Sequence, residues 1–226
     1  MTGLEALAAQ LPRVTALIGG GGKTSLLYLL GQTLAAQGKR VVLTTTTHLA
    51  QDDDAISPAS AKELNNIQTE NAPILAAYPA ADGRMTGIPA EWYDAVAADY
   101  ILVEADGSRR LPLKVHRSFE PVIPPGTELV IQMAGLSALG QTMGECVHCY
   151  HEMGLAAGQT VDEERITQIL LRGFEQCSTI PRRLAALNQA DTAARLAAGE
   201  TIQRQLARAG VRAAVTRLKG EVFCLF

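Results

Sequence analysis

The residues with the clearest chemical meaning form one stretch: Gly19, Gly20, Gly21, Gly22, Lys23, Thr24 and Ser25. Glycines let a backbone curl closely around an oxyanion, and the N–H groups of such a loop bind phosphate together with the start of the following helix. A lysine in this place reaches the terminal phosphates of a nucleotide, and a threonine hydroxyl ligates Mg²⁺. We therefore predict that this stretch binds ATP or GTP with Mg²⁺.

The spacing of this stretch differs from the common phosphate loop, G-x-x-x-x-G-K-[ST]. Counted back from Gly22, the first glycine of that pattern would fall at position 17, where the chain has Leu17. The pattern G-x-x-G-K-T fits instead, beginning at Gly19. The competing interpretation is a glycine turn that merely starts a helix, and G-K-T-S between an apolar run and an amphipathic segment argues against it. We expect a phosphate loop that is short, not broken.

A second chemical group ends the apolar run at residues 100–106, YILVEAD. Alternate residues of a strand share a face, so the carboxylates of Glu104 and Asp106 can point to one site. Carboxylates in this place hold Mg²⁺ or its waters opposite the loop threonine. We predict that Thr24, Glu104 and Asp106 hold the metal and that Lys23 acts with both carboxylates in catalysis. The alternative is a strand that ends in a solvated acidic turn. The positive charges that follow are Arg109, Arg110 and Lys114.

The segment ALNQAD at residues 186–191 bears on the choice of base. Asn188 and Asp191 have the N-x-x-D spacing of the guanine-binding N-K-x-D motif, in which the carboxylate accepts N–H groups of guanine. Gln189 stands where that motif has lysine, so ATP and GTP both stay open. In the alternative interpretation, Asp191 only caps the next helix.

Hydroxyl groups gather at residues 44–48, TTTTH, after another apolar run. At the carboxyl end of a parallel strand, one of these threonines or His48 can contact Mg²⁺ or the γ-phosphate. The alternative, almost equally weighted, is a β-branched strand end whose hydroxyls bond to the protein itself.

Sulfur and imidazole groups occur together in CVHCYH, where Cys146, His148, Cys149 and His151 suggest Zn²⁺. A closed zinc site needs a second ligand pair, and Cys177 and Cys224 are isolated in the sequence. We therefore favour a partly buried helical segment over metal or redox chemistry.

Short apolar runs alternate with helical patterns along the whole chain. Helical patterns begin at residues 24, 162 and 191, and the last two apolar runs suggest a hairpin across Lys219 and Gly220. This alternation predicts an α/β fold: a mostly parallel sheet with helices on both faces, the three-layer sandwich of phosphate-loop NTPases. We expect a single nucleotide-binding domain over residues 1–226, with an irregular insertion around residues 51–87. The strands are expected at residues 14–19, 39–47, 72–78, 100–106, 128–135, 182–189, 211–218 and 221–226.

Composition narrows the function classes. The formal net charge of -3 argues against nucleic acid as a partner, because a phosphate backbone requires a basic excess. No apolar run approaches the ~18 residues of a membrane span, and the first residues carry an acid where a signal peptide has base. Four cysteines do not form a disulfide scaffold in a chain of this size. We expect a cytoplasmic protein.

Taken together, these segments resemble one family, the YqeC proteins associated with selenium cofactor biosynthesis and selenium-dependent hydroxylases. The matching stretches are GGGGKTS, TTTTHL, ILVEADGSRRLPLKVH, EPVIP, GLSALGQ and LNQAD, in the family's order. The resemblance implies a nucleotide-binding accessory factor for selenium-dependent molybdenum hydroxylases. Its partners would be a molybdenum hydroxylase or the proteins that assemble its cofactor. Two residues depart from the family pattern: Gln189 replaces lysine, and Cys149 stands where arginine is usual.

Three functions are consistent with these features. The first is a nucleoside triphosphatase that acts in maturation of such hydroxylases, and it is the one we favour. The second is an ATP-dependent transferase or ligase acting on a selenium or molybdenum cofactor intermediate, because the short loop resembles that of the Mur ligases. The third is a non-enzymatic nucleotide-binding scaffold or metal-carrying chaperone.

Overall fold

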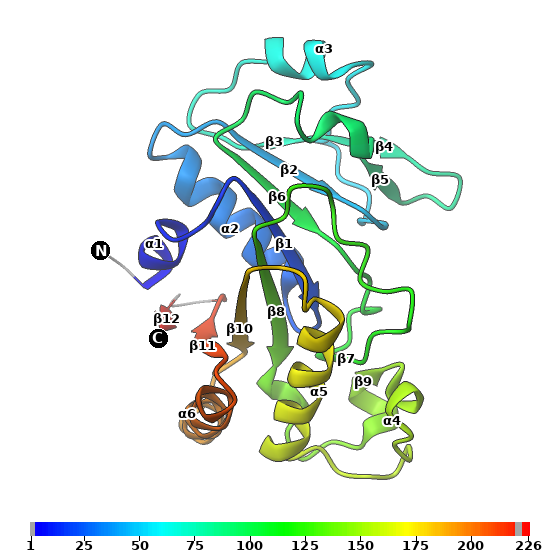
Figure 1. Cartoon of the computed structure of the whole chain (residues 1–226), viewed down its shortest axis with the longest axis vertical. Helices are drawn as coiled ribbons and strands as arrows, with labels where there is room; N and C mark the ends of the chain where they lie inside the picture. The colour runs from blue at the N-terminus through cyan, green and yellow to red at the C-terminus, as the bar shows by residue number, and fades with distance from the viewer. Residues whose placement is uncertain (1–2, 220–222) are drawn as a thin grey trace.

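The apolar runs form the strands of one large sheet in a computed structural model, which describes residues 3–219 and 223–226 (Figure 1). Its strands are β1 Val14–Gly19, β2 Val41–Thr45, β3 Ile74–Leu75, β6 Tyr100–Glu104, β8 Leu129–Gly135, β10 Arg182–Asn188, β11 Arg212–Arg217 and β12 Phe223–Leu225. Their order across the sheet is β12-β11-β10-β8-β1-β6-β2-β3. Strand β1 therefore lies inside the sheet, paired in parallel with β6 on one side and β8 on the other.

All neighbouring strands of this sheet are parallel except β12, which pairs antiparallel with β11. The predicted hairpin at the end of the chain is therefore confirmed, although its turn lies partly outside the described residues. Parallel strands direct their carboxyl ends to the same edge of a sheet, which is where α/β proteins bind ligands. That edge carries the candidate site.

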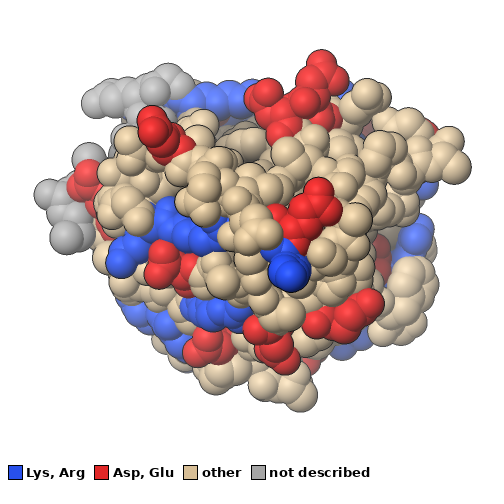
Figure 2. All heavy atoms as spheres, turned by 90° about the horizontal axis from the view of Figure 1, so that it is seen from above, with Lys and Arg blue, Asp and Glu red and all other residues tan. Residues whose placement is uncertain are grey.

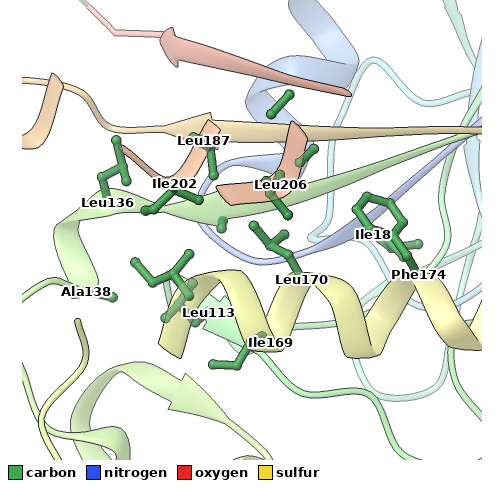
Figure 3. Packing of buried hydrophobic residues seen from close by; sticks show 14 of the residues in the cluster. Ile18, Leu113, Leu136, Ala138, Ile169, Leu170, Phe174, Leu187, Ile202 and Leu206 are labelled. Atoms are coloured by element: carbon green, nitrogen blue, oxygen red, sulfur yellow. The ribbon is translucent and has the colours of Figure 1, made fainter. Parts of the chain in front are cut away.

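Helices cover both faces of the sheet, as its continuous apolar strands require. On β1, Leu17 packs with Leu26 and Leu30 of helix α2, Lys23–Ala35. The next residue, Ile18, points to the opposite face and packs with Leu170 and Phe174 of another helix, α5 (Figure 3). Helix α1, Gly3–Ala8, lies on the side of α2, and α5, Glu163–Gln176, and α6, Ala193–Arg208, share the other face. The predicted three-layer α/β arrangement is confirmed.

The two long C-terminal helices begin at side-chain caps. The carboxylate of Asp162 accepts a hydrogen bond from the N–H of Arg165 at the start of α5. The hydroxyl of Thr192 accepts one from the N–H of Arg195 at the start of α6. Thr192 is thus the N-cap of α6, and the alternative in which Asp191 caps that helix is wrong.

Residues 51–87, for which the sequence suggested irregular structure, contain one short helix and three short strands. These are α3 Ala61–Asn66, β3, β4 Ala77–Pro79 and β5 Met85–Gly87. Strand β3 extends the main sheet beyond β2, whereas β4 and β5 form a separate antiparallel hairpin. The single strand predicted at residues 72–78 is therefore divided between two sheets.

The segment CVHCYH was expected to be helical, and this expectation is wrong. Helix α4, Met143–Cys146, ends at the first cysteine, and the chain continues as strand β9, Val147–His148. Strand β9 pairs in parallel with β7, Leu113–Lys114. A 3₁₀ helix, η3 Tyr150–Met153, follows after Cys149, which is its N-cap. Two further 3₁₀ turns are η1 Ala90–Trp92 and η2 Leu136–Ala138.

The surface shown in Figure 2 carries lysine and arginine side chains interspersed with aspartate and glutamate, and neither sign of charge forms a continuous patch there. Among the described residues, no helix has both the length and the apolar character to cross a membrane.

Candidate functional site

The glycine loop connects the carboxyl end of β1 to the start of α2, as predicted. Gly19 has φ +90° and Gly21 has φ +78°, values that side-chain-bearing residues rarely adopt. A Cβ atom on Gly21 would lie 2.4 Å from the N atom of Gly135, and one on Gly19 would lie 2.2 Å from the carbonyl oxygen of Met133. Both positions therefore require glycine for conformation and for space.

Three distant segments hold this loop in place. The N–H of Gly20 donates to the carbonyl of Met133 at 3.0 Å, and the N–H of Gly21 donates to the carbonyl of Leu111 at 3.2 Å. The side-chain amide of Asn188 donates to the carbonyl of Gly21 at 2.7 Å. The side chain of Asn188, which the sequence predicted to bind nucleotide, therefore anchors the glycine loop.

The start of α2 leaves backbone donors available. Gly22 is the N-cap and offers no side-chain acceptor, and the first helical hydrogen bond runs from Leu26 N–H to the Gly22 carbonyl. The N–H groups of Lys23, Thr24 and Ser25 therefore face out of the helix end. Such N–H groups, aligned with the helix dipole, favour a bound anion.

Lys23 is buried beside the loop and faces both predicted carboxylates. Its Nζ donates to the carbonyl of Gly19 at 2.6 Å. The same atom lies 3.1 Å from Oδ1 of Asp106 and 3.8 Å from Oε1 of Glu104. The structure thus brings together the three residues that the sequence nominated for catalysis.

Thr24 and Glu104, two of the predicted metal ligands, contact each other. The hydroxyl of Thr24 donates to Oε2 of Glu104 at 2.7 Å. Burial raises the pKa of Glu104, while Lys23 and the Thr24 hydrogen bond oppose that rise. A hydroxyl and a carboxylate are hard oxygen ligands, the type that Mg²⁺ prefers.

Within the described part of the chain, no three His, Cys, Asp or Glu side chains are grouped to hold a metal by themselves. Mg²⁺ usually keeps several waters and binds through one or two carboxylates together with substrate phosphates. The residues present at Thr24 and Glu104 therefore fit Mg²⁺ delivered with a nucleotide better than a resident metal.

Asp106 is fully buried and differs in its surroundings from Glu104. Its Oδ2 accepts from the N–H of Gly19 at 2.8 Å and lies 2.6 Å from Nε2 of His116. Nζ of Lys114 lies 3.6 Å from the same oxygen. Burial alone would raise the pKa of Asp106, but Lys23, His116 and Lys114 together hold it below its usual range. Asp106 is an ionised carboxylate that positions Lys23 and the first glycine of the loop.

Sequence reasoning missed His116 and Glu120 and gave Lys114 only a general positive charge. The Nζ of Lys114 has no exposed surface, and it donates to the carbonyl of Gly107 at 2.7 Å and to Oε1 of Glu120 at 2.9 Å. The i, i+2 spacing of Lys114 and His116 was an available signal, because it places both side chains on one face of an extended segment. Only the tertiary structure shows that this face meets Asp106.

The threonine run is engaged mostly with the protein backbone. The hydroxyls of Thr44, Thr45 and Thr46 donate to the carbonyls of Ala76, Glu104 and Val122, respectively. His48, at the end of the run, is exposed. These bonds favour the alternative interpretation, in which the hydroxyls satisfy the end of β2 and its neighbours.

The side chains of Asp191 and Gln189 make their contacts with other residues, whereas Asn188 bonds to the glycine loop. The carboxylate of Asp191 is about half exposed and lies 3.5 Å from the guanidinium of Arg195. Gln189 adopts φ +67°, and its side-chain oxygen accepts from the hydroxyl of Ser137 at 2.5 Å. The structure therefore leaves the choice of base open.

The cysteine and histidine cluster is dispersed. Cys146 is buried and donates its thiol to the carbonyl of Thr142 at 3.1 Å, and burial raises its pKa to about 11. Cys149 Sγ lies 3.4 Å from Nε2 of His148, whereas His151 lies beside Glu152. The absence of a metal-holding group among the described residues applies here as well.

The fold and this site define an α/β protein whose glycine loop lies at the carboxyl edge of a mostly parallel sheet. The chain belongs to the YqeC family: the family model described as YqeC protein matches residues 15–151, a region that contains the loop, both carboxylates and the β7–β9 pair. A curated relative, the uncharacterized protein YqeC of Escherichia coli (strain K12), is 34% identical over 170 residues. That match covers 69% of this chain and 64% of the relative, less than two thirds of the relative's length.

Proposed function

We propose that the protein binds a nucleoside triphosphate together with Mg²⁺ and hydrolyses it. The observation that carries the proposal is the 2.7 Å hydrogen bond between the Thr24 hydroxyl and Glu104, directly beside the buried ammonium of Lys23 and the uncapped start of α2. Phosphoryl transfer depends mainly on positioning and on stabilisation of charge, and this edge of the sheet offers both.

Each residue has a distinct task in this proposal. The N–H groups at the start of α2 bind the phosphates, and Lys23 supplies a fixed positive charge at the mouth of the loop. Asp106 holds Lys23 in place through the ion pair at 3.1 Å. Thr24 and Glu104 would hold Mg²⁺, which would supply positive charge to stabilise the phosphates.

The biological setting is proposed from the resemblance to selenium-related YqeC proteins. We propose an accessory protein for maturation of selenium-dependent molybdenum hydroxylases, located in the cytoplasm, whose partners are such a hydroxylase or its cofactor-assembly proteins. Hydrolysis would drive a conformational change or a handover on that client.

Calorimetric titration with non-hydrolysable ATP and GTP analogues, each with Mg²⁺, tests nucleotide binding. We expect saturable binding of one nucleotide, lost in Lys23→Ala and retained in Lys39→Ala, a matched exposed lysine that follows the same helix. Tight binding of GTP alone would assign Asn188 and Asp191 to guanine, and tight binding of ATP alone would assign them to the loop and the surface. Wild-type protein that binds neither analogue would refute the proposal.

A transferase or ligase is the second candidate function, because the basic segment that carries Arg109, Arg110 and Lys114 contacts the glycine loop, whose Gly21 N–H donates to the carbonyl of Leu111 at 3.2 Å. Such an enzyme would consume nucleotide only in the presence of an acceptor. Nucleotide hydrolysis that is slow alone and accelerates with a phosphate- or carboxylate-bearing acceptor would favour it over the simple hydrolase.

A further inference from the structure

A cavity of about 490 Å³ lies at the amino edge of the main sheet, the edge opposite the glycine loop. Its lining includes the first residues of three neighbouring strands: Leu129 of β8, Arg182 of β10 and Arg212 of β11. These strands are parallel and in register, so their first residues lie side by side. The glycine loop follows the carboxyl end of β1, and the cavity is therefore separate from the candidate nucleotide site.

The floor of this cavity is apolar. Four buried side chains that line it come from both faces of the sheet: Leu7, Leu129, Phe174 and Leu184. Gly210, after the end of α6, leaves space beside them, because a Cβ atom there would meet no described atom within 4 Å. The volume lies within the roughly 300–1,000 Å³ of small-molecule sites, which are usually apolar with a few polar groups. The cavity can therefore hold the apolar body of a small organic molecule.

Gln10 brings two guanidinium groups together at the rim of the cavity. The guanidinium of Arg182 donates to the backbone carbonyl of Gln10 at 2.6 Å. That of Arg212 donates to Oε1 of the same residue at 3.0 Å. The side-chain amide of Gln10 donates in turn to the carbonyl of Ala6 at 2.8 Å, which fixes its orientation. Because a guanidinium carries five N–H donors, both arginines keep donors for a ligand.

The positive charge at this rim is not compensated by the protein. Arg183 also lines the cavity, as a third guanidinium. Within the described part of the chain, Arg182, Arg183 and Arg212 form no ion pair with an aspartate or a glutamate. Glu175 is the one acid among the described residues of the lining, and it is paired with Arg172 at 3.1 Å. Three cations therefore face a cavity whose acid already has a partner.

Capping of the nearby helix end does not account for these cations. Basic side chains often bond to the last carbonyls of a helix, and α6 ends beside the cavity. The carbonyl of Leu206 in its last turn, however, accepts a hydrogen bond from the N–H of Val211 at 2.9 Å. The carbonyl of Ala207 accepts one from the N–H of Gly210 at 3.0 Å. The backbone thus satisfies this end of α6, and the guanidinium groups are available for another role.

We propose that this cavity binds a small organic anion with an apolar body and one carboxylate or phosphate group. The apolar body occupies the buried floor, and the head group accepts hydrogen bonds from Arg182, Arg183 and Arg212 at the rim. Guanidinium groups bind both kinds of oxyanion through paired, charge-assisted hydrogen bonds. The site does not depend on the proposed nucleotide function, because it is built from other residues at the opposite edge of the sheet.

Calorimetric titration of the full chain with four probes tests this site: octanoate, octyl phosphate, octanamide and inorganic phosphate. We expect saturable binding of one octanoate or octyl phosphate, and the tighter of the two identifies the head group. Octanamide has nearly the shape of octanoate without its charge, so it should bind about tenfold more weakly or worse. Inorganic phosphate should fall equally far below octyl phosphate, because it buries no CH₂ groups. If neither octyl anion binds, or if removing the charge or the chain changes nothing, the proposal is overturned.

Matched variants locate the bound anion. Arg183→Gln and Arg212→Gln remove charge from the rim, whereas Ala209→Trp fills the cavity and keeps all three arginines. Each should weaken binding about tenfold or more, and thermal melts should show a Tm near that of the wild type because these residues are exposed. Arg204→Gln removes an exposed arginine of α6 outside the cavity and should retain full affinity. Equal affinity in all four variants would show that the anion binds elsewhere.

Lys23→Ala distinguishes this site from the nucleotide site. It should abolish nucleotide binding and leave the affinity for the octyl anions unchanged, because Lys23 lies at the other edge of the sheet. Loss of octyl-anion binding in Lys23→Ala would place the anion in the glycine loop and refute the second site. A protein that binds no nucleotide but still binds an octyl anion would refute the nucleotide function alone.

Discussion

Asp106 is the buried charge on which the geometry of the site depends, and its replacement by asparagine tests that dependence. The substitution keeps the shape of the side chain and removes its charge. The negative charge beside His116 Nε2, at 2.6 Å, would be removed, and Lys23 would lose its closest carboxylate at 3.1 Å. We expect the folded state to become less stable and Lys23 to lose its fixed position.

The magnitude follows from what each cation retains. Lys114 keeps Glu120 at 2.9 Å, so its charge stays compensated. Lys23 keeps only the Gly19 carbonyl and Glu104 at 3.8 Å. Removal of one partner from a buried ion pair typically costs about 3–5 kcal/mol, and relief from desolvating the aspartate offsets part of this. We therefore expect the lower end, about 3 kcal/mol, which corresponds to a fall in Tm of roughly 6–12 °C for a chain of this length.

Urea and thermal denaturation at pH 7 measure this effect, with Asp82→Asn as control. Asp82 is paired with Arg84 on the surface, so its replacement should leave Tm unchanged. Because the pKa of folded Asp106 lies below 3.8, its contribution is present above that pH and is lost as the pH falls toward the folded value. The difference between wild type and Asp106→Asn should therefore narrow only below about pH 4. A variant within 2 °C of wild type at pH 7 would refute the reasoning.

Three further predictions concern the loop, the metal and the thiols. Gly21→Ala should abolish nucleotide binding and lower Tm, because its Cβ atom would lie 2.4 Å from the N atom of Gly135 in a backbone at φ +78°. The control variant Gly83→Ala is also at positive φ but has open space around it, so it should lower Tm slightly and leave nucleotide binding intact. Calorimetry measures the binding of both variants, and thermal melts measure their Tm. Glu104→Gln should leave the fold intact and weaken the Mg²⁺-dependent part of the nucleotide affinity by at least tenfold. If the wild-type protein binds nucleotide equally tightly with and without Mg²⁺, the proposed metal site is contradicted. Burial raises the pKa values of Cys146 and Cys177 to about 11, so both thiols should resist alkylation at pH 8 until the protein is unfolded in urea. Mass spectrometry measures the alkylation of the native and the unfolded protein, and rapid modification of the native protein would contradict this prediction.

Local patterns were sufficient for most of the secondary structure. The apolar run at residues 14–19 and the glycines after it predicted β1 and the loop with the observed bounds. Strand length, burial on both faces and positive φ each require particular residue types within a few positions, so a short stretch of sequence is enough to predict them. The structure of the CVHCYH segment was predicted wrongly because it depends on a partner far away in the sequence. Its two-residue strand β9 pairs with β7, whose residues lie 34 positions earlier in the chain (Leu113 pairs with Val147), and nothing within the segment itself specifies that partner.

The same distinction between local patterns and long-range contacts applies to the residues of the site. The sequence by itself determined that Lys23 and Thr24 begin a helix after a glycine loop and that Glu104 and Asp106 end an apolar strand, because each is a local pattern. Only the tertiary structure decided that Thr24 meets Glu104, that His116 meets Asp106, and that Asn188 reaches Gly21 across 167 residues of chain. The physical reason is strand order: the position of β1 between β6 and β8 depends on how whole faces of the sheet bury their apolar surface, and that is a property of the complete fold.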